Sequence, residues 1–261
     1  ETHIEVSGRP FKITSGRVVD EVLGSGPVTD TRTPAGGRID RLPDFNRGPI
    51  SNGTFTVGRT IEGPVGRAEN WMGLPAWDPL QSGGFCVASR VAVESGKRVR
   101  HEAQIGFGLA GRAAVGMIET GTRVLLAQEI YNQRPGRYTF TVRLAAEADP
   151  QTVKLWSSRF RARIALFRFT DLTRDMTRIA DLASTPFTPP FGADPIDVSV
   201  SRLLKDQQGG GGELLKGIGV AVIVEHTGKS LDLATSEFKS AILRVQRARA
   251  RFLPRDFSFA S

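Results

Sequence analysis

From about residue 50 onward, apolar and polar residues alternate along much of the chain. The alternation is clearest over 98–107, 137–144 and 196–201, whereas 218–224 is apolar at nearly every position. A period of two residues is typical of a strand with one buried face, and a continuous apolar run indicates a strand covered on both faces. Gly, Pro, Asn and Asp separate these segments. Many short strands with turn residues between them predict two packed antiparallel sheets, and we expect an all-β jelly-roll β-sandwich.

Helical patterns are scarce in this sequence. Leu172, Met176, Ile179 and Leu182 have helical spacing, and the segment 231–241 has apolar residues suited to a turn or two of helix. We therefore expect one or two short helices beside the sandwich.

The first 49 residues differ in composition from the rest of the chain. They contain few large apolar side chains and many Gly, Pro, Thr and Arg residues, so little of this segment can build a core. Strand-like pieces occur at 3–6 and 17–22. We predict an extended N-terminal arm, a sandwich and a C-terminal tail, over residues 1–49, 50–253 and 254–261 respectively.

The composition is that of an ordinary globular chain. Its 261 residues can bury a core without disulfides or metals, and the single cysteine, Cys86, is expected to act as a small buried apolar residue. No apolar run approaches the roughly 20 residues of a membrane-spanning helix. The chain begins with Glu1 and shows no secretory signal pattern; we expect a processed or trimmed start, which maturation or the choice of the expressed chain explains equally well.

The net charge of +8 is concentrated in two segments. Six Arg oppose two Asp over 157–178, and five Arg oppose one Asp over 244–256, so each segment carries +4 and the remainder is balanced. In both segments Arg recurs at every second position, which in a strand forms a row of guanidinium groups on one face. The candidate contacts for an anionic partner are Arg159, Arg161, Arg163, Arg247, Arg249 and Arg251.

Two interpretations of these arginine rows stay open. Arg binds carboxylate and phosphate groups through two parallel hydrogen bonds, so the rows could meet an acidic partner. Alternatively, they cover a solvated sheet face and pair with neighbouring acids. A nucleic-acid partner is disfavoured because no aromatic residues are interleaved for base stacking. The parity over 159–169 also places the arginines on one face with Ala165 and Phe167, which predicts a bulge or a strand that passes from an exposed to a covered position.

The sequence contains no recognisable catalytic or metal-binding spacing. Its three histidines, His3, His101 and His226, are isolated from one another, and no nucleophile elbow or dinucleotide fingerprint is present. Carboxylate pairs such as Glu119 and Glu129 have the bland interpretation of solvated acids. We therefore expect a non-enzymatic protein without a cofactor or a metal.

Several short motifs carry a family resemblance. Residues 51–58 read S-N-G-T-F-T-V-G, Trp71 and Trp77 follow, and the segments 134–140 (R-P-G-R-Y-T-F) and 240–245 come later. Together they resemble the galactose-binding-like jelly-roll modules, many of which are carbohydrate-binding modules or domains of virion and surface proteins. The resemblance implies a non-catalytic domain in which Trp71 and Trp77 bind a sugar. The alternative is that both rings pack into the core, and the small number of tyrosines argues against a platform of several coplanar rings.

Two functions follow from these observations. The first is a structural or assembly protein whose N-terminal arm docks onto neighbouring subunits, as a homo-oligomer or in a larger particle such as a virion tail. The second is a secreted carbohydrate-binding module that uses Trp71 and Trp77, with the arginine rows favouring acidic glycans. Both place the protein on a virion or outside the cell, and a nucleic-acid partner ranks last.

Overall fold

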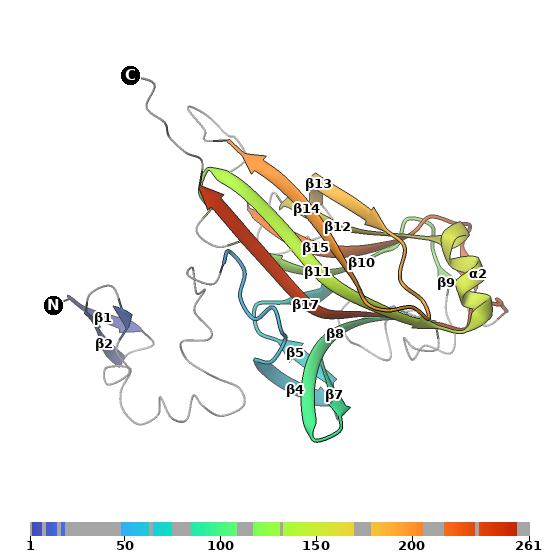
Figure 1. Cartoon of the computed structure of the whole chain (residues 1–261), viewed down its shortest axis with the longest axis horizontal. Coiled ribbons are helices and arrows are strands. Elements are labelled where there is room, and N and C mark those ends of the chain that lie inside the picture. The colour runs from blue at the N-terminus through green and yellow to red at the C-terminus, as the bar shows by residue number, and fades with distance from the viewer. Residues whose placement is uncertain are drawn as a thin grey trace.

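The computed structural model describes residues 2–6, 9–14, 17–18, 48–62, 65–74, 85–108, 117–130, 133–169, 179–205, 217–232 and 235–254. Within them, two antiparallel sheets face each other (Figure 1). The larger sheet contains, in spatial order, β14 (Ile196–Leu204), β11 (Gly136–Ala148), β17 (Ser240–Pro254), β8 (Arg98–Gly108), β7 (Phe85–Ser95), β5 (Val65–Ala68) and β4 (Gly58–Glu62). The smaller sheet contains β13 (Ile179–Phe187), β12 (Phe160–Phe169), β15 (Ile218–His226), β10 (Arg123–Glu129) and β6 (Met72–Leu74). A separate two-stranded sheet consists of β16 (Leu231–Asp232) and β9 (Met117–Ile118), which pair with each other.

The chain passes repeatedly from one sheet to the other. The chain goes from β10 in the smaller sheet to β11 in the larger one and returns to the smaller sheet for β12 and β13. It then crosses to β14 in the larger sheet, returns to β15 and ends in β17 of the larger sheet. Such crossings over the top of a two-layer core are typical of jelly rolls. The predicted all-β jelly-roll sandwich is confirmed.

The core lies between the sheets, where the predicted alternation points its apolar side chains. On β11 the side chains of Tyr138, Phe140, Val142 and Leu144 are buried, and the intervening polar residues face outward. The facing strand β15 is buried along almost its whole length, as its continuous apolar run predicts. The alternating pattern thus marks a strand that is covered on one face, β11, and the continuous apolar run marks a central strand, β15, as expected.

The helix lies elsewhere than predicted. α2 (Pro150–Arg159) connects β11 to β12 across one end of the sandwich (Figure 1). Asp149 caps it by accepting hydrogen bonds from the backbone N–H groups of Gln151 and Thr152, both at 3.1 Å. Its Trp156 ring is buried and stacks on Phe160 at 4.8 Å.

Both predicted helical segments need correction where the structure describes them. Ile179 and Leu182 belong to strand β13, in which residues three apart lie on opposite faces, so their spacing does not mark a helical face. Leu172 and Met176 lie outside the described residues. The described part of 231–241 contains β16 and turns instead of a helix.

Strand β12 explains the parity over 159–169. Its outward side chains run from Arg161, which is exposed, through half-buried Arg163 to Ala165 and Phe167, which are fully buried. The strand thus passes from an exposed to a covered position, as one of the two interpretations predicts, and its pairing with β13 also shifts register between Leu166 and Phe167.

Three strands near the N-terminus form a sheet of their own. β1 (Thr2–Val6), β2 (Arg9–Thr14) and β3 (Arg17–Val18) pair in sequence order, all antiparallel. The strand-like piece predicted at 3–6 falls in β1, and the one predicted at 17–22 begins with β3. Residues 19–22 lie outside the described residues, and β2 was not predicted. Most of the predicted arm lies outside the described residues, so the division into arm, sandwich and tail stays a prediction.

Candidate functional site

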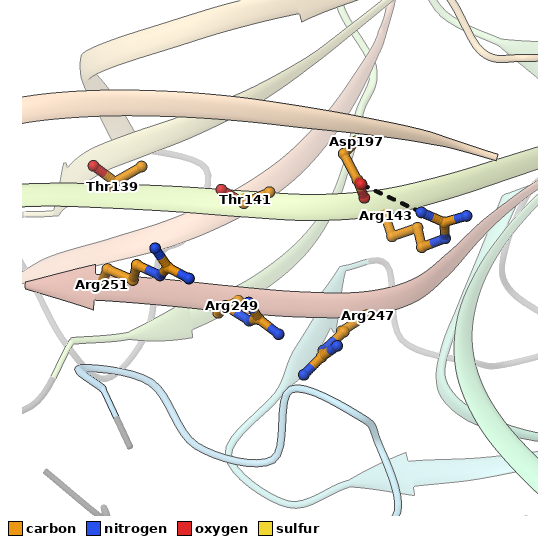
Figure 2. A pocket seen from close by; sticks show the side chains of 7 residues that line it. All are labelled: Thr139, Thr141, Arg143, Asp197, Arg247, Arg249 and Arg251. Carbon is orange, nitrogen blue, oxygen red and sulfur yellow. Dashed lines mark hydrogen bonds and ion pairs between the residues drawn. The ribbon is translucent and has the colours of Figure 1, made fainter. Parts of the chain in front are cut away.

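A groove of about 370 Å³ lies on the outer face of the larger sheet, the side that faces away from the core. Its lining side chains come from three neighbouring strands, β17, β11 and β14 (Figure 2). They are Thr139, Thr141, Arg143, Asp197, Arg247, Arg249 and Arg251. We call this surface the arginine groove. It contains the whole second arginine row predicted from the sequence.

Strand pairing arranges the groove in rows. Arg249 on β17 lies opposite Thr141 on β11, which in turn lies opposite Ser199 on β14. The next row contains Arg251, Thr139 and Ser201. The third row contains Arg247, Arg143 and Asp197. Arginines follow β17, whereas β11 contributes two threonines and Arg143 to the lining. Ser199 and Ser201 on β14 are paired with the threonines but are not among the lining residues.

A bulge in β17 places the arginines on this face. The register of β11 against β17 shifts between Arg143 and Leu144, whose partners are Arg247 and Val245, and leaves Gln246 between them. Beyond this bulge Ala248 and Ala250 point into the core, so Arg247, Arg249 and Arg251 all point outward. The small alanines let this part of the strand approach the segment at residue 53, where the backbone N–H of Ala248 donates to the carbonyl of Gly53 at 2.8 Å.

The charges in the groove are not balanced. Asp197 accepts a hydrogen bond from Arg143 at 3.2 Å, which compensates that one guanidinium. Arg247, Arg249 and Arg251 are exposed and make no ion pair or side-chain hydrogen bond with any other residue that the structure describes. This part of the sheet therefore carries three exposed positive charges that no described residue compensates.

A buried ion pair lies on the same outer face beyond the bulge. Glu102 on β8 is fully buried, and it accepts hydrogen bonds from Arg244 Nε at 2.7 Å and Nη2 at 3.2 Å. Arg244 also bonds Glu147, and Gln104 donates to Glu102 at 2.8 Å. The hydrogen bond to Glu102 raises the pKa of Arg244 above its ordinary value. Because these charges satisfy one another, this cluster has a structural role.

The first predicted arginine row is only partly a row. Arg159 ends helix α2 instead of belonging to a strand, since the chain becomes extended only at Phe160, and its Nη1 donates to the carbonyl of Lys229 at 3.1 Å. Arg163 pairs with Asp181 at 2.8 Å and with Glu225 at 3.1 Å. Of these three arginines, only Arg161 is exposed and has no ion-pair or hydrogen-bond partner among the described residues. Arg161 and Arg163 lie on the outer face of the smaller sheet, away from the groove, and Arg163 matches the interpretation in which neighbouring acids compensate the charge.

The predicted sugar-binding tryptophans are not brought together on a surface. Trp71 is 5% exposed, its ring packs on Phe55 at 5.2 Å, and its Nε1 donates to the carbonyl of Asn52 at 3.0 Å. This position favours the alternative that the ring packs into the core, because neither ring face is open to a ligand. Trp77 lies outside the described residues.

The N-G-x-F motif that carried the resemblance is an anchoring loop. The Asn52 side chain donates to the carbonyls of Val57 at 2.7 Å and Glu69 at 3.0 Å, and accepts from the N–H of Val57 at 3.1 Å. A Cβ on Gly53 would lie 2.0 Å from the carbonyl oxygen of Ala248, so this close approach to β17 requires glycine. The motif therefore positions the strand that carries the arginine groove.

The remaining candidate chemistry is structural in the described part of the chain. His226 is buried at the end of β15 with its Nδ1 3.1 Å from the carbonyl oxygen of Glu119. His101 lies 3.0 Å from Arg90 Nη2, and burial together with that guanidinium lowers its pKa. No group of three or more His, Cys, Asp or Glu side chains suited to a metal occurs among the described residues. Nor does any helix there have the length and apolar character needed to cross a membrane.

The groove residues of β11 and β14 were not predicted. The outward position of Thr139, Thr141 and Arg143 could be read from the alternation over 137–144, but their place beside β17 depends on pairing between distant segments. Asp197 is separated from Arg143 by 54 positions, and no local pattern signals their ion pair.

No protein-family model and no curated protein matches this sequence. Among solved structures, the chain is similar to a carbohydrate-binding module, CBM4, with a TM-score of 0.40 and 14% identity, over 78% of this chain and 99% of that one. TmCBM61, solved with β-1,4-galactotriose, gives a TM-score of 0.37 and 11% identity over 79% and 99% of the two chains. The enzymatically active domain of bacteriophage CBA120 tailspike protein 4 gives 0.39 and 14% over 79% of this chain and 22% of that one. Carbohydrate-binding modules are thus among the structures that this chain is similar to, as the sequence resemblance leads us to expect, and the likeness concerns the sandwich fold alone.

Proposed function

We propose that this protein is a non-catalytic binding domain that holds an anionic glycan in the arginine groove, on a virion or outside the cell. One observation carries the proposal: Arg247, Arg249 and Arg251 are exposed on one face of β17 without a counter-charge among the described residues, and they lie beside the hydroxyl groups of Thr139 and Thr141. Guanidinium groups bind carboxylates and sulfates through paired, charge-assisted hydrogen bonds.

The shape of the groove favours a polymer. Its volume of about 370 Å³ falls at the lower end of the range of small-molecule sites, but it follows an open sheet face instead of an enclosed cavity. Successive arginines on one face of β17 are separated by about 6.5 to 7 Å along the strand. A chain with repeated acidic groups can meet all three guanidinium groups at once, whereas a single small anion meets one or two.

The groove also distinguishes between polyanions. Its lining contains no aromatic side chain, so it offers no platform on which the bases of a single-stranded nucleic acid would stack. The Thr and Ser hydroxyls beside the arginines can donate and accept hydrogen bonds, which suits the hydroxyl groups of a sugar. These features support a glycan in preference to a nucleic acid.

A structural role in an assembly is a second candidate. β1, β2 and β3 pair only with one another among the described strands, which fits an N-terminal segment that docks onto a neighbouring subunit. Light scattering on the full chain and on a chain lacking residues 1–49 tests this role. Oligomers that persist after the deletion would contradict docking through the arm.

The glycan proposal is tested with two forms of one polymer. Isothermal titration of the full chain with polygalacturonate and with its methyl-esterified, neutral form changes only the ligand charge. We expect binding to the acidic form, a steep loss of affinity as salt is raised, and little binding to the ester. Equal binding to both forms, or none to the acidic form, would contradict the proposal.

A further inference from the structure

The arginine groove has two long sides of different chemistry. Resting on the proposed function, we infer that the groove recognises both edges of its ligand, acidic groups along β17 and sugar hydroxyls along β11 and β14. The ligand class is then a polymer of the uronic-acid type, in which every sugar residue carries both a carboxylate and free hydroxyls. A polyanion without hydroxyls would use only the arginine side.

The strand register supports this two-sided arrangement. Two successive rows have the same order across the sheet, with arginine on β17, threonine on β11 and serine on β14. Figure 2 shows Thr139 and Thr141 following β11 beside Arg251 and Arg249 on β17. A ligand that lies parallel to β17 therefore meets the same pair of chemistries at both of these rows.

The hydroxyl groups keep hydrogen-bonding capacity for a ligand. Thr141 Oγ1 and Ser199 Oγ lie 2.7 Å apart, and Thr139 pairs with Ser201 in the same way. A hydroxyl has one donor and two acceptor lone pairs, so each pair uses one hydrogen and retains a second O–H donor and free lone pairs. Ser199 and Ser201 are exposed. Such groups can donate to one sugar hydroxyl and accept from another.

The third row limits where acidic groups can bind. Asp197 is exposed and carries a negative charge at the end of the hydroxyl side, where Arg143 already compensates it. A carboxylate placed there would meet a like charge. The acidic groups of the ligand therefore belong along β17, beside Arg247, Arg249 and Arg251, and a neutral part of the sugar belongs beside Asp197.

The test removes the hydroxyls and keeps the arginines. In the full chain, Thr139→Val with Thr141→Val preserves the branched shape that suits a strand, and Thr60→Val, an exposed threonine on β4 of the same sheet, serves as the matched control. Titrations with polygalacturonate and with poly-L-glutamate compare two carboxylated polymers, of which only the first has hydroxyls. We expect the double variant to bind polygalacturonate roughly five-fold or more weakly, with its affinity for poly-L-glutamate unchanged and both affinities unchanged in the control.

The outcomes separate the inference from the proposed function. A double variant that binds polygalacturonate as the original chain does, or that loses equal affinity for both polymers, would overturn two-sided recognition while leaving an anion-binding groove. Failure of the original chain to bind polygalacturonate would instead overturn the proposed function, and the inference with it. If the double variant is unstable in thermal melts, Ser199→Ala with Ser201→Ala on β14 removes the partner hydroxyls, and the same losses are expected.

Discussion

Arg247 and Arg143 lie opposite each other on β17 and β11, and Asp197 pairs with Arg143 alone, at 3.2 Å. Like charges directly opposite each other destabilise a sheet. The arrangement persists in an exposed position where solvent screens the repulsion, and it leaves Arg247 and its two neighbours on β17 available for an external anion.

Asp197→Asn should increase the affinity for an anionic glycan. The change removes the one negative charge of the groove and leaves Arg143 free to bind the ligand. Because the pair is exposed, we expect a cost in the free energy of unfolding of only about 0.2 to 1 kcal/mol. The measurement is titration with polygalacturonate, combined with urea denaturation.

Asp181→Asn is the matched control for this change. It removes an equal charge from the ion pair with Arg163 on the opposite outer face, at 2.8 Å. We expect a similar or larger loss of stability and no gain in affinity. Equal gains in both variants would show that net charge, and not the groove, governs binding.

The sequence predicts most of the strands because their periodicity is local. The alternation over 98–107, 137–144 and 196–201 corresponds to β8, β11 and β14. The outward row on β17 follows from the same rule, since Arg247, Arg249 and Arg251 alternate with small apolar residues. The helix α2 also has a local signal, Asp149 as cap followed by Pro150, although its apolar spacing is weak.

The groove itself could not be predicted, because it depends on which distant strands pair. β11 lies between β14 and β17, which are separated from it by dozens of residues along the chain. No local pattern distinguishes a solvated arginine row from one beside a hydroxyl row. Trp71 illustrates the same limit, since its burial depends on Phe55 and Asn52 and not on its immediate sequence.

Glu102→Gln should destabilise the fold strongly. Glu102 is fully buried and compensates Arg244 through two hydrogen bonds, so the neutral amide leaves a guanidinium with less compensation in a largely buried place. We expect a loss of about 3 kcal/mol in urea denaturation. Glu147→Gln, at the 62% exposed partner of the same arginine, should cost less than about 1 kcal/mol. Similar costs for both variants would contradict the structural role of the buried pair.

Trp71→Ala should reduce stability without reducing glycan affinity. The change leaves a cavity beside Phe55 and removes the hydrogen bond to Asn52, which together cost about 3 to 5 kcal/mol. Trp71→Phe keeps an aromatic ring and should cost less. The two quantities are measured by chemical denaturation and by titration of the folded protein. A variant with an unchanged free energy of unfolding that no longer binds polygalacturonate would show instead that Trp71 contacts the sugar.

Stability should fall in alkaline solution partly through Tyr138. Its hydroxyl accepts from the N–H of Arg134 at 2.8 Å and donates to the carbonyl of Arg134 at 3.0 Å. Burial raises the pKa of this hydroxyl, although its bonds with Arg134 oppose the shift. A raised folded-state pKa stabilises the fold below the unfolded pKa of about 10, and this contribution is lost as pH rises above it.

Tyr138→Phe checks this pH dependence. The variant should lose about 1 kcal/mol at neutral pH with the missing hydrogen bonds, and its stability should decline less steeply than that of the original chain above about pH 10. Urea denaturation between pH 7 and pH 11 measures both effects. Parallel profiles for the two proteins over this range would contradict the assignment.

The most direct test of the arginine groove is the loss of glycan binding on Arg249→Ala with Arg251→Ala. The control is Arg98→Ala with Arg161→Ala, two exposed arginines outside the groove lining, which gives the same change in net charge. We predict that the groove variant binds polygalacturonate at least tenfold more weakly at moderate salt, a difference of about 1.4 kcal/mol, and that the control stays within about twofold of the original chain. Equal losses in the two variants, or an unchanged affinity in the groove variant, would contradict the account.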